Sequence, residues 1–231
     1  MLKIPKNVLV IAAHPDDEVL GCGGTIARLV REGKKVHVLI LANGLTSRPA
    51  HDKSNNEDLL KQHHQRAQQA GSLMGTAGVR VLGFPDQKLD TLPLLEITQA
   101  IEREIERVQP DTIFTHHGGD LNQDHVITYR ATLTATRPLP GVCVQSVYAY
   151  EVPSSTEWSF LRFAPHFQPN AFFDIGDTLQ VKIAAMQIYQ SEVRDYPHPR
   201  SPRALQAIAH RWGSVVGLNA AEAFELVREI K

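Results

Sequence analysis

Short apolar runs alternate with amphipathic segments along the chain. Residues 7–13 (NVLVIAA) are apolar and rich in β-branched residues, which is typical of a buried parallel strand. Ile26, Leu29 and Val30 then recur at helical spacing within residues 21–32, and Gly33 ends that segment. Residues 35–42 (KVHVLILA) predict a second strand. This strand–helix–strand order indicates a βαβ unit with a right-handed crossover.

The same alternation continues to the end of the chain. Residues 43–56 are polar and predict a loop. Further strands are predicted over residues 79–83, 111–115, 142–150 and 171–175, and helices over residues 57–74, 94–108, 126–136, 178–193, 203–212 and 220–230. Alternating strands and helices indicate an α/β three-layer sandwich with a mainly parallel sheet. We expect one domain over residues 1–231. Its core is residues 1–150, and residues 151–231 are a helical C-terminal extension that shapes a pocket or a subunit interface.

Composition narrows the class of protein. Apolar residues make up 42% of the 231 residues, so the chain can bury a sizeable core. Lysine and arginine number 24 against 25 acidic residues, which gives no reason to expect a nucleic-acid partner. No apolar run reaches the roughly 18 residues of a membrane span, and the first residues lack a secretory signal pattern. Two cysteines are too few for a disulfide scaffold, so we expect a cytoplasmic protein.

Metal-capable side chains follow two of the predicted strands. The first set is His14, Asp16, Asp17 and Glu18; the second is His116, His117, Asp120, Asn122, Asp124 and His125. If the two strands are neighbours, the two loops face each other beyond the carboxyl edge of the sheet. Two histidines and a carboxylate would then form a three-ligand site with an open position, the pattern of catalytic zinc.

The acids also have a structural interpretation. Asp16, Asp17 and Glu18 could cap the following helix, where carboxylates satisfy free N–H groups and suit the helix dipole. Three consecutive acids repel one another, however, and a bound cation would explain why they are tolerated. Spacing alone leaves both interpretations open.

Two motifs resemble a known family. The segment His14-Pro15-Asp16-Asp17-Glu18, followed by residues 21–24 (GCGG), resembles the LmbE/PIG-L family of zinc-dependent deacetylases. Residues 120–125 (DLNQDH) resemble that family's second metal motif, and residues 84–86 (FPD) look like a substrate-side segment. The likeness covers about residues 7–136. It implies a Rossmann-like fold and zinc-dependent hydrolysis of an N-acetyl group, commonly on an N-acetylglucosamine-type sugar, with one zinc ion per chain.

The resemblance assigns roles by position. His14, Asp17 and His125 would be the zinc ligands, and Asp16 would be the general base that takes a proton from water. Zinc can lower the pKa of a bound water to about 7 and polarise an amide carbonyl, and a nearby carboxylate can accept the proton. Asp124 would orient an imidazole or take part in a proton relay. Glu18 would support the loop or cap the helix.

One position departs from the family pattern. Asn122 stands where many members have a histidine, and an amide can donate a hydrogen bond but cannot shuttle a proton at pH 7. His198, in the proline-rich residues 196–201 (YPHPRS), is our candidate for the general acid. The alternative is that His198 and Arg200 make structural contacts or a subunit interface.

Substrate contacts are sought among polar residues near strand ends. Asp86 and Glu151 follow predicted strands, and Asn122 and Arg200 are further candidates. Arg48 and Arg66 are also possible contacts, although such residues are more often plain surface charges. His63 and His64 are expected on a solvated helix face. The expected partner is a small-molecule N-acetylated sugar or its conjugate. Two other functions stay open: an amidohydrolase that acts on another N-acyl compound, and a non-catalytic module that binds a sugar or a nucleotide. A homo-oligomer is also possible, because several relatives of this fold form oligomers.

Overall fold

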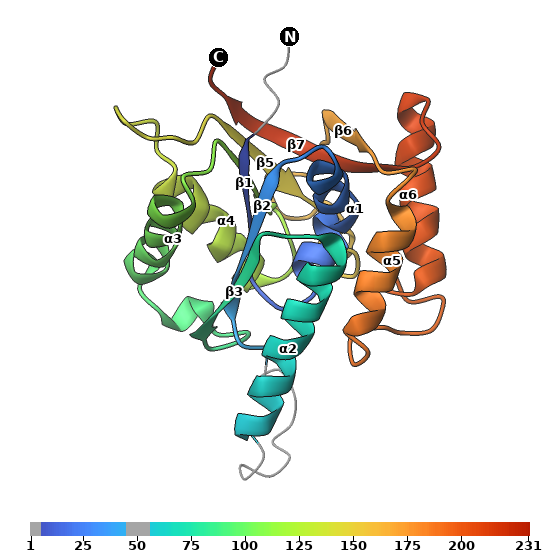
Figure 1. The fold of residues 1–231 in the computed structure, drawn as a ribbon, viewed down its shortest axis with the longest axis horizontal. Coiled ribbons are helices and arrows are strands. Elements are labelled where there is room, and N and C mark those ends of the chain that lie inside the picture. Colours follow the sequence, from blue (N-terminus) through green and yellow to red (C-terminus); the bar gives the residue numbers. More distant parts are fainter. Residues whose placement is uncertain (1–5, 45–55) are drawn as a thin grey trace.

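A seven-stranded sheet runs through the molecule, with helices on both faces (Figure 1). The structure, a computed structural model, describes residues 6–44 and 56–231. The strand order is β3-β2-β1-β4-β5-β7-β6. The strands are β1 (Asn7–Ala12), β2 (Lys35–Ala42), β3 (Gly78–Phe84), β4 (Thr112–His116), β5 (Ser146–Tyr150), β6 (Ala171–Asp174) and β7 (Ala221–Glu229). The first five are parallel, and β7 is antiparallel to both β5 and β6.

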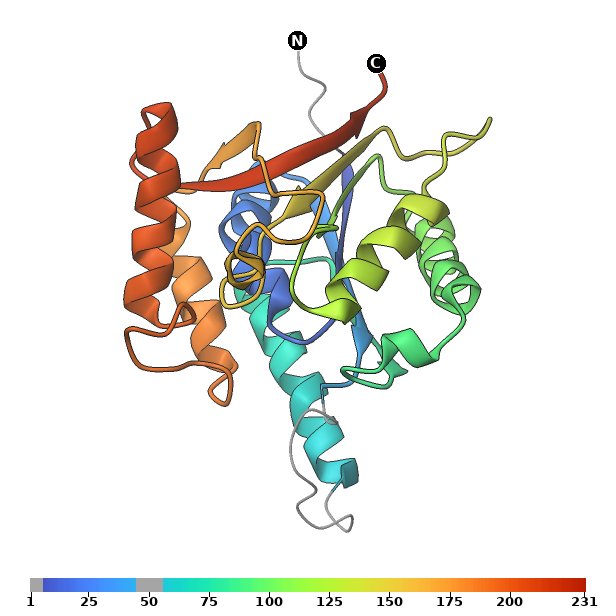
Figure 2. The same cartoon turned by 180° about the vertical axis from the view of Figure 1, so that it is seen from behind.

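Two hydrophobic layers cover the sheet because successive side chains of β1 point to opposite faces. Val8 and Val10 pack in the layer formed with α1 (Asp17–Arg31), α2 (Asn56–Met74), α5 (Leu179–Ile188) and α6 (Pro202–Val216). Leu9 and Ile11 pack in the layer formed with α3 (Leu94–Val108) and α4 (Gln123–Ala135). Figures 1 and 2 show the two helical layers from opposite sides. The predicted three-layer α/β architecture with a mainly parallel sheet is confirmed.

The last predicted helix is wrong. Residues 220–230 were expected to be helical, but β7 occupies Ala221–Glu229 and ties β6 to β5. Alanine and glutamate favour helices, and this propensity hid a strand pattern in which Ala221 and Ala223 lie on one face and Phe224 on the other. The C-terminal extension therefore has two helices, α5 and α6, and then returns to complete the sheet.

The carboxyl ends of β1 and β4 lie side by side. The two strands pair in parallel from Val8↔Thr112 to Val10↔Phe114, so the loops that follow them open at the same edge of the sheet. This edge is the switch point of the topology, because the chain runs outward from β1 to β2 and β3 and then crosses back to β4. The two predicted sets of metal-capable residues are thus brought together.

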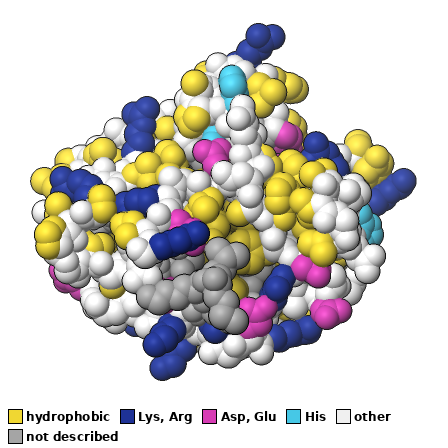
Figure 3. Space-filling view, turned by 90° about the horizontal axis from the view of Figure 1, so that it is seen from above, with side chains coloured by type: hydrophobic (Ala, Val, Ile, Leu, Met, Phe, Trp, Pro, Cys, Tyr) yellow, Lys and Arg dark blue, Asp and Glu magenta, His cyan; other side chains and the backbone are white. Residues whose placement is uncertain are grey.

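At the opposite end of the molecule, the described side chains include charges of both signs. Figure 3 views the end at which β1 begins, and there lysine and arginine side chains are spread among acidic and apolar ones. In the part of the chain that the structure describes, no helix has the length and apolar character that a membrane crossing needs. Residues 45–55 of the predicted loop, and Arg48 with them, lie outside the described residues.

Candidate metal centre and active site

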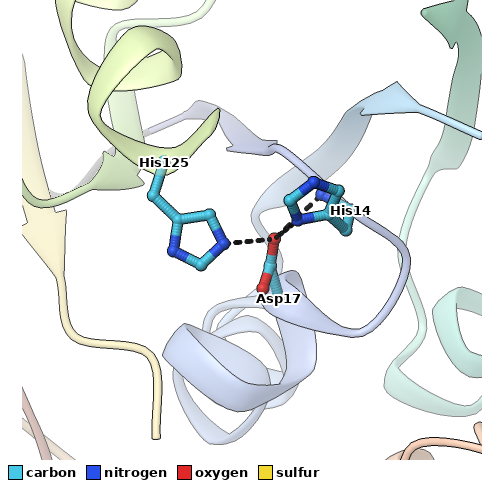
Figure 4. A group of neighbouring side chains, drawn as sticks. All are labelled: His14, Asp17 and His125. Carbon is cyan, nitrogen blue, oxygen red and sulfur yellow. Dashed lines mark hydrogen bonds and ion pairs between the residues drawn. The ribbon is translucent and has the colours of Figure 1, made fainter. Parts of the chain in front are cut away.

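Three buried side chains converge beyond the ends of β1 and β4 (Figure 4). His14 lies in the loop after β1, Asp17 is the first residue of α1, and His125 lies in the first turn of α4. The Oδ2 atom of Asp17 is 3.3 Å from His14 Nδ1 and 3.3 Å from His125 Nε2. Two imidazole nitrogens and one carboxylate oxygen, all within 4.8 Å of one another, form a donor set typical of zinc.

Each of the two imidazoles has a carboxylate behind it. Asp124 Oδ2 lies 3.0 Å from His14 Nε2, and Asp120 Oδ1 lies 3.2 Å from His125 Nδ1. A carboxylate at the far nitrogen fixes the ring orientation and leaves the near nitrogen with its lone pair toward a cation. Asp124 is held in turn by the Leu89 N–H, and Asp120 by the hydroxyl of Thr156. The residues therefore fit a divalent metal in both the donor set and its support.

The buried carboxylates raise the pKa of both imidazoles. Burial alone would lower the pKa of His14, but hydrogen bonds to Asp124 and Asp17 outweigh it and raise the pKa to about 10. Burial is likewise outweighed at His125, where Asp17 and Asp120 raise the pKa to about 9. His125 and His116 hold the pKa of Asp17 well below its usual value against the effect of burial. The pocket thus favours positive charge at this point.

His116 and His117 do not join the donor set. His116 Nε2 accepts a hydrogen bond from the Ala13 N–H at 2.8 Å, which occupies its lone pair, and the ring stacks on His125. Burial and the neighbouring His125 lower the pKa of His116 to about 4. His117 Nδ1 accepts from the Gly119 N–H, and its Nε2 faces Glu225. Both histidines are packed residues beside the site.

Asp16 lies between His14 and Asp17 along the chain, and its backbone conformation is unusual. Its φ of 114° lies in the left-handed region, which costs a non-glycine residue energy and is often found at functional sites. The Asp16 N–H donates to Glu18 Oε2 at 3.1 Å, and Glu18 Oε1 accepts from the Tyr189 hydroxyl at 2.6 Å. These contacts hold the loop, which is the supporting role expected of Glu18.

Arg200 fixes the carboxylate of Asp16. Its Nη1 donates to Asp16 Oδ2 at 2.8 Å, its Nε donates to Ser154 Oγ at 2.7 Å, and Glu192 Oε2 lies 3.4 Å away. Burial raises the pKa of Asp16 well above its usual value, and the Arg200 guanidinium opposes that shift. The C-terminal extension thus supplies the partner of a residue near the start of the chain.

A polar cavity opens over this centre. Of the predicted residues, it is lined by the three converging side chains together with Asp16, Asp86, Asn122 and Arg200. Asp86 Oδ1 lies 3.2 Å from His14 Nε2. Asn122 caps α4 by accepting from the Asp124 N–H through Oδ1, which leaves its NH₂ group as a donor. Asp124 lies behind His14 rather than on the cavity wall.

Two predicted residues lie elsewhere. His198 is not among the cavity-lining residues; its Nδ1 accepts from the Arg200 N–H at 3.1 Å, and its ring meets the edge of Trp158. Glu151 lies half-buried against α6, where its carboxylate accepts a hydrogen bond from the Trp212 indole at 2.5 Å. His198 therefore positions the Arg200 loop, and Glu151 contacts the C-terminal helix instead of this cavity.

Two side chains of α2 line the cavity, one of which was expected on a solvated face and the other of which was more often expected to be a surface charge. They are His63 and Arg66, both half-buried, and Arg66 Nη1 donates to Ser191 Oγ at 3.3 Å. The pattern of apolar residues on the buried side of α2 could have indicated that both side chains face the cavity. Ala67, Ala70 and Met74 form that side, and His63 continues it by one turn.

The comparisons with known proteins agree with this architecture. The family model described as PIG-L: GlcNAc-PI de-N-acetylase matches residues 9–136. The chain is 28% identical over 192 residues to "Uncharacterized deacetylase YaiS" of Escherichia coli (strain K12), covering 80% of this chain and 91% of that protein. It is 26% identical over 227 residues to the diacetylchitobiose deacetylase of Thermococcus kodakarensis, covering 96% and 83%. The structure of N,N′-diacetylchitobiose deacetylase from Pyrococcus horikoshii superposes with a TM-score of 0.78 at 22% identity, covering 97% and 84%, which shows the shared fold.

Proposed function

The chain belongs to the PIG-L family of N-deacetylases, hydrolases of amide carbon–nitrogen bonds, and from this membership we propose that it is a zinc-dependent enzyme that removes an N-acetyl group from an amino sugar or its conjugate. The observation that carries the proposal is the donor set of His14, Asp17 and His125 with Asp124 and Asp120 behind the two rings. The likeness to a diacetylchitobiose deacetylase over most of both chains supports an amino-sugar substrate.

One zinc ion per chain would be held by His14 Nδ1, the Asp17 carboxylate and His125 Nε2. Bound there, zinc would polarise the amide carbonyl and lower the pKa of a water molecule to about 7. Asp124 and Asp120 would keep the two rings in the ligating orientation. The centre would retain an open position, because three protein ligands leave room for water or substrate.

Asp16 is the proposed general base. Its carboxylate lines the cavity next to the ligand set, where it can take a proton from the attacking water. The left-handed backbone of Asp16, the Glu18 contact and the Arg200 guanidinium fix its direction. Burial raises the pKa of this carboxyl, which makes its ionised form a stronger base, and the Arg200 guanidinium favours that ionised form.

Four side chains of the cavity wall are proposed to orient the substrate. Asn122 can donate from its NH₂ group to the acetyl carbonyl or to a hydroxyl, and Asp86 can accept from a sugar hydroxyl. Arg66 adds a donor on the α2 side, and Arg200 adds one beside Asp16. Such convergent polar groups on a cavity wall provide specificity for a hydroxyl-rich ligand.

The experiment that tests the proposal is an acetate-release screen with metal analysis. N-acetylglucosamine, N,N′-diacetylchitobiose and N-acetylglucosamine conjugates are incubated with the protein before and after treatment with a chelator. We expect acetate from at least one of them, loss of activity with the chelator, and recovery when zinc is added. Turnover that survives complete metal removal would overturn the zinc assignment. Tight binding of an unhydrolysed N-acetyl sugar by a protein without metal would favour the binding-module alternative.

A further inference from the structure

The proposed deacetylation needs a proton for the nitrogen that leaves, and this inference rests on that proposed function. Amide cleavage is slow unless the amine takes up a proton as the carbon–nitrogen bond breaks. Among the described residues that line the cavity, three are histidines: His14, His63 and His125. His14 and His125 converge on Asp17 and are backed by carboxylates. His63 comes from a different element, α2, and belongs to neither pair.

The other side chains of the cavity are poorly suited to give up a proton near pH 7. Asn122 is an amide, and Arg66 and Arg200 keep their protons throughout the neutral range. The Tyr189 hydroxyl donates to Glu18, and burial raises its pKa well above the usual value. Glu192 accepts from Ser191 and lies beside Arg200. Histidine is the side chain most often used as a general acid near neutral pH, and of the three histidines on the described cavity wall only His63 lies outside the proposed donor set.

The backbone makes room for the His63 ring. Gly44, two residues after the end of β2, has a φ of 74°, a conformation that favours glycine. A Cβ on Gly44 would lie 3.0 Å from His63 Nδ1 and 3.2 Å from Pro15 Cδ. The ring therefore lies against a bare stretch of backbone, next to the loop that carries His14 and Asp16. Half-buried in the cavity wall, the ring lies where it can contact a bound substrate.

We propose that His63 is a catalytic residue, the general acid that protonates the leaving amine. The water oxygen bonds to the carbonyl carbon, and one water proton goes to the Asp16 carboxylate. The carbon–nitrogen bond then breaks, its electron pair stays on nitrogen, and that nitrogen takes a proton from the His63 imidazolium. The products are the free amine and acetic acid. Transfer of one proton from Asp16 to His63 through solvent restores the starting state.

His63→Gln tests the proposal, and His64→Gln is its matched control. His64 is the next residue on α2, is exposed and is not among the cavity-lining residues. With the zinc-loaded protein and the N-acetyl sugar that the wild type hydrolyses best, we expect His63→Gln to lower kcat by about 10²–10⁴-fold. KM, zinc content and the thermal midpoint should stay near the wild-type values. His64→Gln should match the wild type in all four.

Two further measurements separate chemistry from structure. In His63→Ala, free imidazole added to the assay should restore part of kcat, whereas a lost structural contact would not be restored. In NMR spectra of the zinc-loaded wild type, the His63 ring resonance should shift when the amine product, glucosamine, is added, and the His64 resonance should not. The second measurement is independent of turnover and of whether the variants fold.

The outcomes distinguish this inference from the proposed function. A wild-type protein that releases no acetate overturns the proposed function itself. A wild type that releases acetate, together with an unchanged kcat in His63→Gln, overturns the role of His63 and leaves Asp16 to carry the proton in both steps. A low kcat in His63→Ala that imidazole does not restore, with a His63 resonance that glucosamine does not move, also overturns it.

Discussion

Asp16 is the residue on which the proposed chemistry depends most. Asp16→Asn keeps the shape of the side chain but removes its ability to accept a proton. We expect the variant to retain zinc, because Asp16 is outside the donor set, and to lose about 10²–10⁴-fold in kcat. Metal analysis and acetate release measured on the same preparation check both parts. Turnover equal to the wild type would remove Asp16 from the role of base.

Asp120 tests the support of the metal centre. Its Oδ1 faces His125 Nδ1, and burial is outweighed by His125 and two hydroxyl donors, so that its pKa falls to about 2. We expect Asp120→Asn to weaken zinc binding by about 10–100-fold, because His125 loses the anionic partner that orients it. Competition with a chromogenic chelator measures the affinity. Asp90→Asn, at an exposed aspartate away from the cavity, is the control and should bind zinc as the wild type does.

The residues of the centre were predictable to unequal degrees. Two predicted strand ends supplied two sets of candidate ligands, and the family resemblance selected His14, Asp17 and His125 from them. The structure places those strands side by side. His63 was assigned to solvent because its neighbours along the chain are polar, whereas its place is set by the buried side of α2. His198 was chosen for its proline-rich loop, but that loop directs Arg200, rather than His198, into the cavity.

At the scale of elements, the contact between α1 and β5 holds the metal loop in place. A Cβ on Gly21 would lie 2.2 Å from Tyr150 Cδ2, and the fully buried Tyr150 donates its hydroxyl to the Ile11 carbonyl. Gly21→Ala would therefore push α1, and with it Asp17, away from the sheet. We expect a loss of about 1–3 kcal/mol in the free energy of unfolding, together with weaker zinc retention.

Gly83→Ala is the matched control for this change. Gly83 lies in β3, and a Cβ there meets nothing within 4 Å. Urea unfolding of the two variants should show a clear loss of stability for Gly21→Ala and little change for Gly83→Ala. Equal stability of Gly21→Ala and the wild type would contradict the close packing of α1 on Tyr150.

The helices and strands were predictable where pattern and propensity agree. The predicted helix over residues 94–108 matches α3, because its apolar positions recur at helical spacing. Over Ala221–Glu229, propensity and pattern disagree, and the strand forms because β5 and β6 offer partners on both sides. Those partners are distant in the sequence, so the local residues could not reveal them.

At the scale of the whole molecule, the site joins two distant parts of the chain. The family match ends at residue 136, yet Tyr189, Glu192 and Arg200 line the same cavity as His14. The hydrogen bond from Arg200 to Asp16 spans 184 residues. Motif reading locates the metal ligands, but the partners of the proposed base depend on how the C-terminal extension folds back, which no local pattern records.

The charge balance of the centre predicts how the stability of metal-free protein depends on pH. The folded-state pKa values of His14 and His125, about 10 and about 9, lie above the ordinary value of 6.5. The folded protein then holds protons that the unfolded chain releases. The stabilisation is complete below pH 6.5 and is lost progressively as pH rises from 6.5 to between 9 and 10, by up to about 1.4 kcal/mol per pH unit for each ring.

Urea unfolding of metal-free protein at pH 6.5 and at pH 9 measures this effect. The free energy of unfolding should be lower at pH 9, and His125→Gln should show a smaller difference between the two values. Zinc-loaded protein should also show a smaller difference, because ligating imidazoles carry no proton at the metal. A free energy of unfolding of metal-free protein that rises with pH over this range would contradict the raised pKa values of His14 and His125.

The most direct test of a metal-centred deacetylase is a zinc titration of metal-free protein, followed by the rate of acetate release from an N-acetylated amino sugar. The account predicts no release without metal and a rate that rises with added zinc until it levels off at one equivalent per chain. His125→Gln should show no such breakpoint. A full rate in the absence of zinc, or no acetate from any N-acetyl sugar at one equivalent, would contradict the account.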